Sequence, residues 1–382
     1  MSRIRLLLVV ISTFFFLACA SDVPPDLLEE PTELSEVEAQ FAVKKSWSVN
    51  VGYGTGKQRL KFVPALTADE VYAADYKGRI WAIDRKTGKK LWKKDLQKLL
   101  SAGPGVRGDR LYLATQEGQL LSLARQDGRL LWSAQLDSEL LAIPLATDEQ
   151  LFAATIDGQI YGLNPTDGSV LWRYATRVPP LTLRGSSGPV LIDNLLLYGA
   201  ADGRLVALNK ISGLPVWDVT ISVAEGRSEL ERIVDIDADP VVFDDTIFVV
   251  TYQGHVAAVD AGSGVLLWRR EMSSFSGLQV ANGELYVTDS SGQIWSLSRR
   301  TGAALWKQDG LMFRDLTAPA FHNGLIVVGD KEGYLHWLSA DNGDFLARDR
   351  IGNDRWLSPM RAVDNELIAL SETGKLISLY LE

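Results

Sequence analysis

A single sequence pattern recurs eight times between residue 76 and the C-terminus of this 382-residue chain. The copy that ends at Trp132 reads QEGQLLSLARQDGRLLW, and the next copy, which ends at Trp172, reads IDGQIYGLNPTDGSVLW. A fixed interval of this kind predicts one structural unit that is used repeatedly. The first glycine of the eight copies lies in turn at Gly78, Gly118, Gly158, Gly203, Gly254, Gly292, Gly333 and Gly374.

Within each copy, apolar and polar residues alternate with the period of two that is typical of β-strands, and glycine-containing turns separate the strands. The fourth copy predicts strands at residues 190–192, 195–200, 204–208 and 215–219. Four-stranded units of about 40–45 residues arranged radially form a β-propeller. We therefore expect an all-β fold, a single eight-bladed β-propeller of four-stranded antiparallel blades over residues 39–382.

The two ends of the chain predict how the ring closes. The eighth copy stops before its last strand, whereas a matching strand around Trp47 precedes the first copy. Pairing of these N-terminal and C-terminal strands would complete the eighth blade and leave no open edge. The tryptophans that recur in register are expected to pack between blades as large apolar plates. Trp356 lies outside this register, in a loop that could be exposed.

The first 38 residues predict an export signal and a tether. Arg3 and Arg5 precede an apolar stretch, residues 6–17, that is too short to span a bilayer and has the length of a signal-peptide core. Residues 20–38 contain seven acidic residues, three prolines and no basic residue, as in a solvated linker. The expected division is a signal peptide over residues 1–18, an acidic flexible tether over residues 19–38, and the propeller.

The residues Phe16, Leu17, Ala18 and Cys19 resemble the lipobox of bacterial lipoproteins, in which cleavage before the cysteine leaves it to be acylated. This resemblance implies that Cys19 is lipidated and anchors the protein to a membrane. Ala20 stands where an aspartate tends to retain such proteins in the inner membrane. The resemblance therefore implies the cell outer membrane, with the protein facing the periplasm; the alternative is a buried free thiol at Cys19.

Charge and cysteine content exclude several classes of function. The chain has 39 Lys and Arg against 48 Asp and Glu, a net charge of −9, so it offers no diffuse basic surface to nucleic-acid phosphates. Its one cysteine excludes an internal disulfide framework and a multi-thiolate zinc site. We expect no nucleic-acid partner, no metal site and no cofactor.

The repeat is lengthened at two consecutive places, where binding loops on a rigid scaffold are expected. Successive first glycines are 45 and 51 residues apart on the two sides of the fourth copy, against 38 to 41 elsewhere. Both extra stretches, within residues 177–188 and 222–240, follow the outer strand of one blade and precede the inner strand of the next. They should therefore be neighbours at one face of the ring.

These two stretches carry the candidate binding residues. Leu181 and Leu183 alternate with a polar residue in a connecting loop, where exposed apolar groups indicate a partner. Arg184 offers a planar cation to carboxylates, and Asp235 and Asp237 offer acceptors on one side of an extended segment. Two other interpretations stay open: the leucines fold onto the propeller while Arg184 pairs with Asp235 or Asp237, or the alternating acids at 235, 237 and 239 bind calcium.

The pattern G-x-[IL]-x-A-[LI]-x-x-x-[ST]-G-x-x-x-W resembles the PQQ-like, or quinoprotein, propeller repeat over nearly the whole mature chain. A lipoprotein with eight such repeats is similar to the BamB family, non-enzymatic scaffold subunits of the machinery that assembles outer-membrane β-barrel proteins. The resemblance implies binding to the periplasmic POTRA domains of BamA within the BAM complex, and contact with unfolded outer-membrane protein clients. In that family the L-x-L-R and D-x-D loops are associated with BamA binding, which here are Leu181, Leu183, Arg184, Asp235 and Asp237.

Quinone-dependent alcohol and sugar dehydrogenases share this repeat and supply the main alternative. The alcohol dehydrogenases use a catalytic carboxylate, a calcium ion and, commonly, a disulfide between adjacent cysteines, whereas this chain has no second cysteine. Acids beside repeat glycines, such as Asp75 and Asp330, are expected to hydrogen-bond turns. We expect no catalytic residue. The remaining alternative is a propeller that binds another envelope protein or a polysaccharide.

Overall fold

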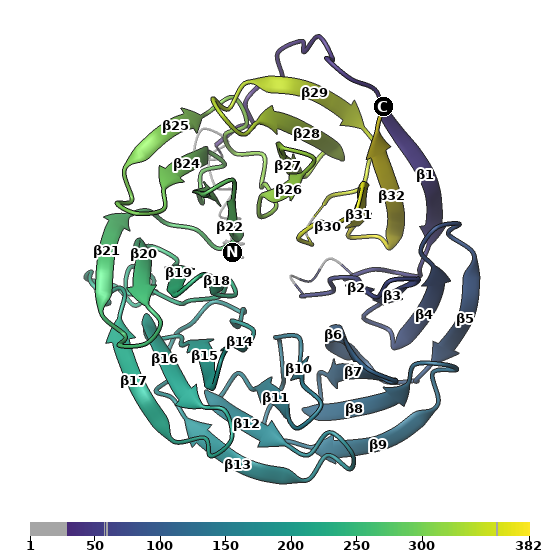
Figure 1. The fold of residues 1–382 in the computed structure, drawn as a ribbon, viewed down its shortest axis with the longest axis vertical. Helices are drawn as coiled ribbons and strands as arrows, with labels where there is room; N and C mark the ends of the chain where they lie inside the picture. The colour runs from purple at the N-terminus through teal and green to yellow at the C-terminus, as the bar shows by residue number, and fades with distance from the viewer. Residues whose placement is uncertain (1–28, 57, 59, 357) are drawn as a thin grey trace, which may run out of the picture. The chain divides into compact units, whose positions relative to one another are not determined.

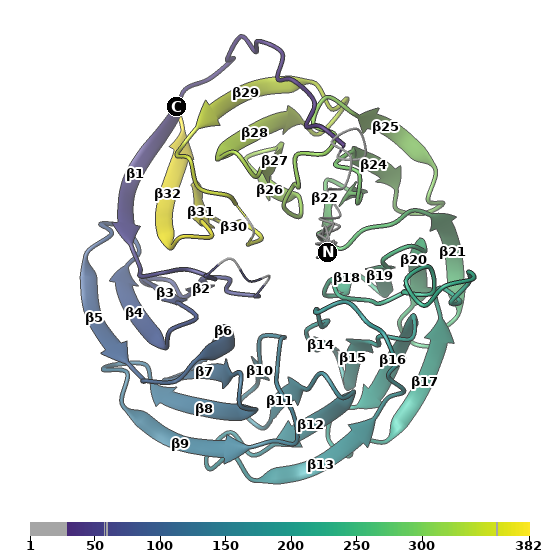
Figure 2. The ribbon, with the colours of Figure 1, turned by 180° about the vertical axis from the view of Figure 1, so that it is seen from behind.

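The computed structural model describes residues 29–56, 58, 60–356 and 358–382. The expected signal peptide and Cys19 lie outside the described residues. Within the compact unit Pro31–Glu382, the described strands form eight four-stranded antiparallel sheets, which follow one another around a ring (Figure 1). The view from behind shows the same closed succession of blades (Figure 2). The sequence prediction of an eight-bladed propeller is confirmed.

Each blade runs from a short inner strand near the axis to an outer strand at the rim. Blade 1 comprises β2 (Ala65–Leu66), β3 (Glu70–Ala74), β4 (Arg79–Asp84) and β5 (Lys90–Asp95). Blade 2 comprises β6 (Leu100–Arg107), β7 (Arg110–Thr115), β8 (Gln119–Ala124) and β9 (Leu130–Gln135). Blade 3 comprises β10 (Leu145–Ala146), β11 (Leu151–Ala154), β12 (Gln159–Leu163) and β13 (Val170–Ala175). Blade 4 comprises β14 (Val190–Ile192), β15 (Leu195–Gly199), β16 (Arg204–Asn209) and β17 (Pro215–Thr220).

The second half of the ring repeats this order. Blade 5 comprises β18 (Val241–Phe243), β19 (Thr246–Val250), β20 (His255–Asp260) and β21 (Leu266–Glu271). Blade 6 comprises β22 (Gly277–Ala281), β23 (Glu284–Thr288), β24 (Ile294–Ser298) and β25 (Ala304–Gln308). Blade 7 comprises β26 (Ala320–His322), β27 (Leu325–Gly329), β28 (Tyr334–Ser339) and β29 (Phe345–Arg350). Blade 8 comprises β30 (Arg361–Val363), β31 (Glu366–Leu370), β32 (Lys375–Leu381) and β1 (Val43–Asn50). None of the described residues belongs to a helix long and apolar enough to cross a membrane.

Closure joins the two ends of the chain, as the sequence predicts. β1 pairs antiparallel with β32, from Val43 opposite Leu381 to Asn50 opposite Lys375. The N-terminal strand thus becomes the outer strand of blade 8. The strand edges that an unfinished blade would leave open are paired instead.

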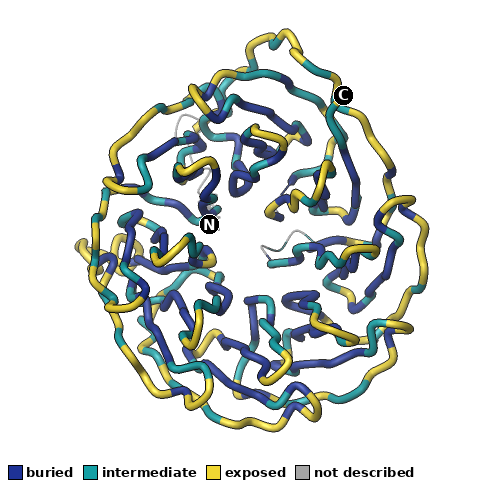
Figure 3. Tube along the Cα trace, viewed as in Figure 1, coloured by how far each residue is buried: buried dark blue, intermediate teal, exposed yellow. Residues whose placement is uncertain are grey.

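Burial explains why the third strand of a blade is almost wholly apolar and the fourth is amphipathic. The central residues of β4 are all buried, because both faces of the strand pack against neighbouring blades. In β5, by contrast, one residue is half-buried and the other five are exposed, since this strand lies at the rim (Figure 3). At the turn before β4, Asp75 accepts hydrogen bonds from the backbone of Lys77 and Arg79, which confirms the turn role expected for such acids.

The recurring tryptophans join seven of the eight pairs of neighbouring blades. The indole nitrogen of Trp92 donates to the carbonyl of Arg125 at 3.0 Å, and its ring lies where a Cβ on Gly128 would come within 2.7 Å. Gly128 also has a φ of +68°, so both space and backbone require glycine there. The same contact recurs between Trp47 and Gly88, Trp132 and Gly168, Trp172 and Gly213, Trp217 and Gly264, Trp268 and Gly302, and Trp306 and Gly343.

The junction between blades 7 and 8 is made differently, because Ala347 stands at the tryptophan position of β29. The segment before β1 covers this junction instead. Phe41 packs against the apolar cluster shared by blades 7 and 8, and the amide of Gln40 donates to the carbonyl of Leu346 at 2.9 Å. Further from β1, the amide of Thr32 donates to the carbonyl of Met312 at 3.0 Å, in the connection between blades 6 and 7. The stretch that the sequence predicts to be a free tether is therefore attached to the propeller from Thr32 onward.

Trp356, whose loop the sequence left open to exposure, is only 1% exposed. It packs against Gly329, where a Cβ would lie 2.6 Å from that of Trp356, and belongs to the apolar cluster shared by blades 7 and 8. The question that the sequence left open is thus decided in favour of burial, because Trp356 packs into this cluster.

Candidate functional site

The two lengthened connections meet at one face of the ring, on either side of blade 4. The amide of Leu183 donates to Oδ2 of Asp235 at 2.6 Å, and the amide of Gly188 donates to Oδ1 of Asp239 at 2.6 Å. The prediction that these stretches are neighbours is thus confirmed. We refer to residues 181–188 together with residues 235–239 as the candidate platform.

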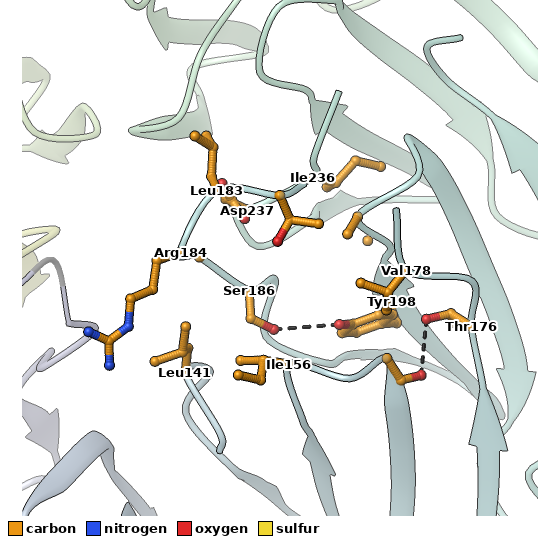
Figure 4. Close-up of a pocket in the computed structure, with 15 residues that line it drawn as sticks. Leu141, Ile156, Thr176, Val178, Leu183, Arg184, Ser186, Tyr198, Ile236 and Asp237 are labelled. Carbon is orange, nitrogen blue, oxygen red and sulfur yellow. Dashed lines mark hydrogen bonds between the residues drawn. The ribbon is translucent and has the colours of Figure 1, made fainter. Parts of the chain in front are cut away.

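The L-x-L-R residues lie on the outer side of the platform. Leu181 is 39% exposed and Leu183 is half-buried. Arg184 is exposed, and its guanidinium lies 2.9 Å from Oε1 of Glu139, in the connection between β9 and β10. The alternative in which Arg184 pairs with Asp235 or Asp237 is therefore wrong. Its guanidinium points away from the cavity beside it (Figure 4).

Asp235 lies beneath the loop rather than on its surface. It is 2% exposed, one carboxylate oxygen accepts from Leu183, and Oδ1 has no hydrogen-bond partner among the described residues. Burial, with the nearby charge of Asp237, raises the pKa of Asp235 to about 7. The sequence interpretation placed this carboxylate among acceptors offered to a partner, whereas the structure shows it bound to the chain's own backbone.

Asp237 is half-buried and faces the same loop from below. A Cβ on Gly185 would lie 2.4 Å from its carboxylate carbon, so the loop can approach this closely only with glycine at 185. Burial raises the pKa of Asp237 to about 6, and the positive charge of Lys61 opposes this rise. Asp235 therefore supports the backbone that carries Leu183 and Arg184, and Asp237 packs closely beneath it.

Two further residues of the site have no signal in the repeat. Lys61, in the connection that enters blade 1, donates to the carbonyls of Ser186 and Asp237 at 2.6 Å each and to Oδ1 of Asp239 at 2.9 Å. Glu139 holds the guanidinium of Arg184. Each is a single charged residue in an irregular connection between blades. The irregularity of these connections is the only signal in the sequence that could have pointed to them.

The positive charge that lies beside Asp237 and Asp239 is the ammonium group of Lys61. Across the part of the chain that the structure describes, no group of three His, Cys, Asp or Glu side chains is placed to hold a metal ion.

Two hollows adjoin the loop. One, of about 230 Å³, is lined by apolar side chains that include Leu141, Ile156 and Ile236, with the buried hydroxyl of Tyr198 3.5 Å from that of Ser186 (Figure 4). The other, of about 720 Å³, is lined by connections that enter blades around the ring. Leu183 and Arg184 border both hollows. Apolar concavity with a cation at its rim suits recognition of a protein surface.

Comparisons with known proteins agree with this architecture. A family model described as "Outer membrane protein assembly factor BamB" matches residues 45–308. Proteins of that name from Pseudomonas aeruginosa and Alkalilimnicola ehrlichii are 48% identical over 360 residues and 51% identical over 352 residues, covering 94% and 92% of this chain and the same shares of the relatives. The crystal structure of BamB from Moraxella catarrhalis aligns with a TM-score of 0.82 at 28% identity, covering 89% of this chain and 100% of that one.

Proposed function

This chain belongs to the BamB family of outer membrane protein assembly factors, and from that premise we propose that it is a non-enzymatic scaffold subunit of the β-barrel assembly machinery. In this role it binds the periplasmic POTRA domains of BamA through the candidate platform and assists the folding and insertion of outer-membrane β-barrel proteins. It is exported by a signal peptide, residues 1–18, and anchored by lipid on Cys19 to the outer membrane, facing the periplasm.

The observation that carries this proposal is the 2.6 Å hydrogen bond between the amide of Leu183 and the carboxylate of Asp235. It joins the two places where an otherwise regular repeat is lengthened. The result is one surface with an exposed leucine, Leu181, beside an exposed arginine, Arg184. Arginine and large apolar side chains that fill pockets account for much of the binding energy in protein interfaces.

Arg184 is already paired with Glu139, but the pair does not block binding. The guanidinium is more than half exposed, and only its Nη2 donates to Glu139. Its other N–H groups can therefore donate to a partner carboxylate while Glu139 keeps the guanidinium extended. The pair thus orients Arg184 for a partner.

A second contact, with unfolded clients, is favoured by the outer strands. Leu171, Val216 and Leu267, on the rims of blades 3 to 5, are exposed apolar residues on edge strands. At blade 7 the chain's own segment pairs with such an edge, through the amide of Gln40 and the carbonyl of Leu346. We propose that clients add to the free edges in the same way, by β-augmentation. Crosslinkers placed at residue 216 should trap clients during barrel assembly, and their absence under conditions that trap BamA adducts would count against this contact.

The test of the main proposal is co-purification from gently solubilised envelopes. Wild-type protein should bring down BamA, whereas Arg184→Ala and the double variant Asp235→Ala/Asp237→Ala should not, although both remain folded. The matched control is Arg107→Ala, because Arg107 is also exposed and paired with an acid, Asp148, at 2.8 Å, but lies at the far end of an inner strand, β6.

If folded wild-type protein brings down no subunit of the machinery, the proposal is wrong. The alternatives to test are then a quinone-dependent dehydrogenase, by reconstitution with quinone and calcium followed by dye reduction, and a propeller for another envelope protein or polysaccharide. Loss of BamA with Arg107→Ala as well would place the contact outside the platform.

A further inference from the structure

We propose that Lys61 is a positioning residue of the candidate platform: its ammonium group fastens the connection that enters blade 1 to both lengthened connections around blade 4. The inference rests on the proposed function, since it takes the platform as the surface that binds BamA. Lys61 itself acts through the loop that carries Leu183 and Arg184.

The ammonium group of Lys61 is placed between the two connections. It has three N–H donors, and three acceptors surround it: the carbonyl of Ser186 at 2.6 Å, the carbonyl of Asp237 at 2.6 Å and Oδ1 of Asp239 at 2.9 Å. Ser186 belongs to the first lengthened connection, and the two acids belong to the second. One side chain therefore links its own segment to two others that lie 125 to 178 positions further along the chain.

The stem of Lys61 is itself held in place. Its neighbours Leu60 and Phe62 are buried, and its backbone forms a parallel bridge with Ala102 in β6. The carbonyl of Phe62 accepts a hydrogen bond from Oγ of Ser358 at 2.6 Å. The ammonium group is thus presented from a fixed backbone, and a rigid support loses little freedom when it forms its contacts.

The contacts of Lys61 complete a series along the loop. Asp235 holds the amide of Leu183, Lys61 holds the carbonyl of Ser186, and Asp239 holds the amide of Gly188. Arg184 lies within this series, so its backbone position depends on all three. Without the ammonium group, the buried Ser186 loses the donor to its carbonyl and Asp239 loses its countercharge. An uncompensated buried acceptor is costly, so we expect the loop to move.

The variant Lys61→Met tests this idea because it keeps a stem of similar length without the charge or the donors. We expect faster amide hydrogen exchange at Leu183 and Gly188 and binding to the BamA periplasmic domains that is weaker by about 3- to 30-fold, the range seen for residues that act without touching a ligand. Lys61→Arg, which retains charge and donors, should restore most of both.

The matched control is Lys375→Met. The ammonium group of Lys375 also donates to a backbone carbonyl, that of Ile351, at 2.6 Å, but near the junction of blades 7 and 8. This variant should change neither the exchange at Leu183 and Gly188 nor the affinity. Should Lys61→Met fail to fold, Lys61→Gln takes its place, since its shorter and neutral side chain lacks both the charge and the reach of the ammonium group.

Unchanged exchange at Leu183 and Gly188 in a folded Lys61→Met protein would overturn the inference, and so would faster exchange with full affinity. Failure of the wild-type protein to bind the BamA domains is a different result, because it would contradict the proposed function. Hydrogen exchange at Leu183 and Gly188 would still decide whether Lys61 positions the platform. A loss of affinity that Lys61→Arg does not restore, with normal exchange, would make Lys61 a direct contact and would also contradict the positioning role.

Discussion

The indole nitrogen of Trp47 donates a hydrogen bond to the carbonyl oxygen of Arg85, 2.7 Å away on the neighbouring blade. Trp47 lies on the first strand of the chain, yet that strand is the outer strand of the last blade. The contact therefore joins blade 8 to blade 1 in the same way that Trp92 joins blade 1 to blade 2. Ring closure uses the same side-chain chemistry as every other tryptophan junction.

Gly88, which lies under the ring of Trp47, should tolerate alanine poorly. A Cβ there would lie 2.6 Å from the ring, and the backbone φ is +71°. Gly283 is the control, because its φ is +79° but nothing lies within 4 Å of an added Cβ. We expect Gly88→Ala to lower the free energy of unfolding by about 1–3 kcal/mol more than Gly283→Ala, as measured by urea titration. Equal losses would show that the tryptophan contact has no energetic weight.

Removal of residues 31–41 should destabilise blade 7 and its junctions with blades 6 and 8. Within this segment Phe41 packs against the shared apolar cluster, and the buried guanidinium of Arg314 donates to the carbonyl of Thr32 at 3.1 Å. We expect the deletion to lower the free energy of unfolding by about 1–3 kcal/mol and to speed exchange in β29. Glu38→Ala, at an exposed position of the same segment, is the comparison and should have little effect. A stable protein without residues 31–41 would contradict the role of this segment.

The contribution of Asp235 to the stability of the protein should fall as pH rises between about 4 and 7. The folded pKa of Asp235 is about 7, above the value of about 3.9 in an unfolded chain, so the folded state binds the proton more tightly. The stabilisation is complete below the unfolded pKa and is lost as pH rises through the folded one, by at most about 1.4 kcal/mol per pH unit. Urea titrations across this range should show the wild type losing stability relative to Asp235→Asn as pH rises, whereas a constant difference between the two would exclude this role of Asp235. Asp148→Asn, at an exposed site, is the control.

Two substitutions of Asp235 should separate support of the loop from contact with a partner. The amide oxygen of Asp235→Asn still accepts from Leu183, so binding to BamA should stay within about threefold of wild type. Asp235→Ala removes the acceptor and should weaken binding by roughly tenfold or more. Affinity for the periplasmic domains of BamA, measured by calorimetry, provides the comparison. If both variants lose binding equally, the charge of Asp235 itself contacts the partner.

The strands of blade 4 could be predicted from the sequence to within one residue. In blade 4, strands expected at residues 195–200 and 215–219 are observed as Leu195–Gly199 and Pro215–Thr220. This accuracy has a physical reason: the strands of a blade pair with their neighbours in the chain, so alternation and turn residues specify them locally. The lengthened connections could be located for the same reason, because they interrupt a regular interval.

The sequence by itself thus determined the blades, the closure and the two loops that meet beside blade 4. Only the tertiary structure decided what supports those loops. The burial of Asp235, the pairing of Arg184 with Glu139 and the reach of Lys61 to Ser186 join residues 45 to 125 positions apart. Such contacts leave no periodic trace in the chain, because they arise only when the closed ring brings the connections of separate blades to one face.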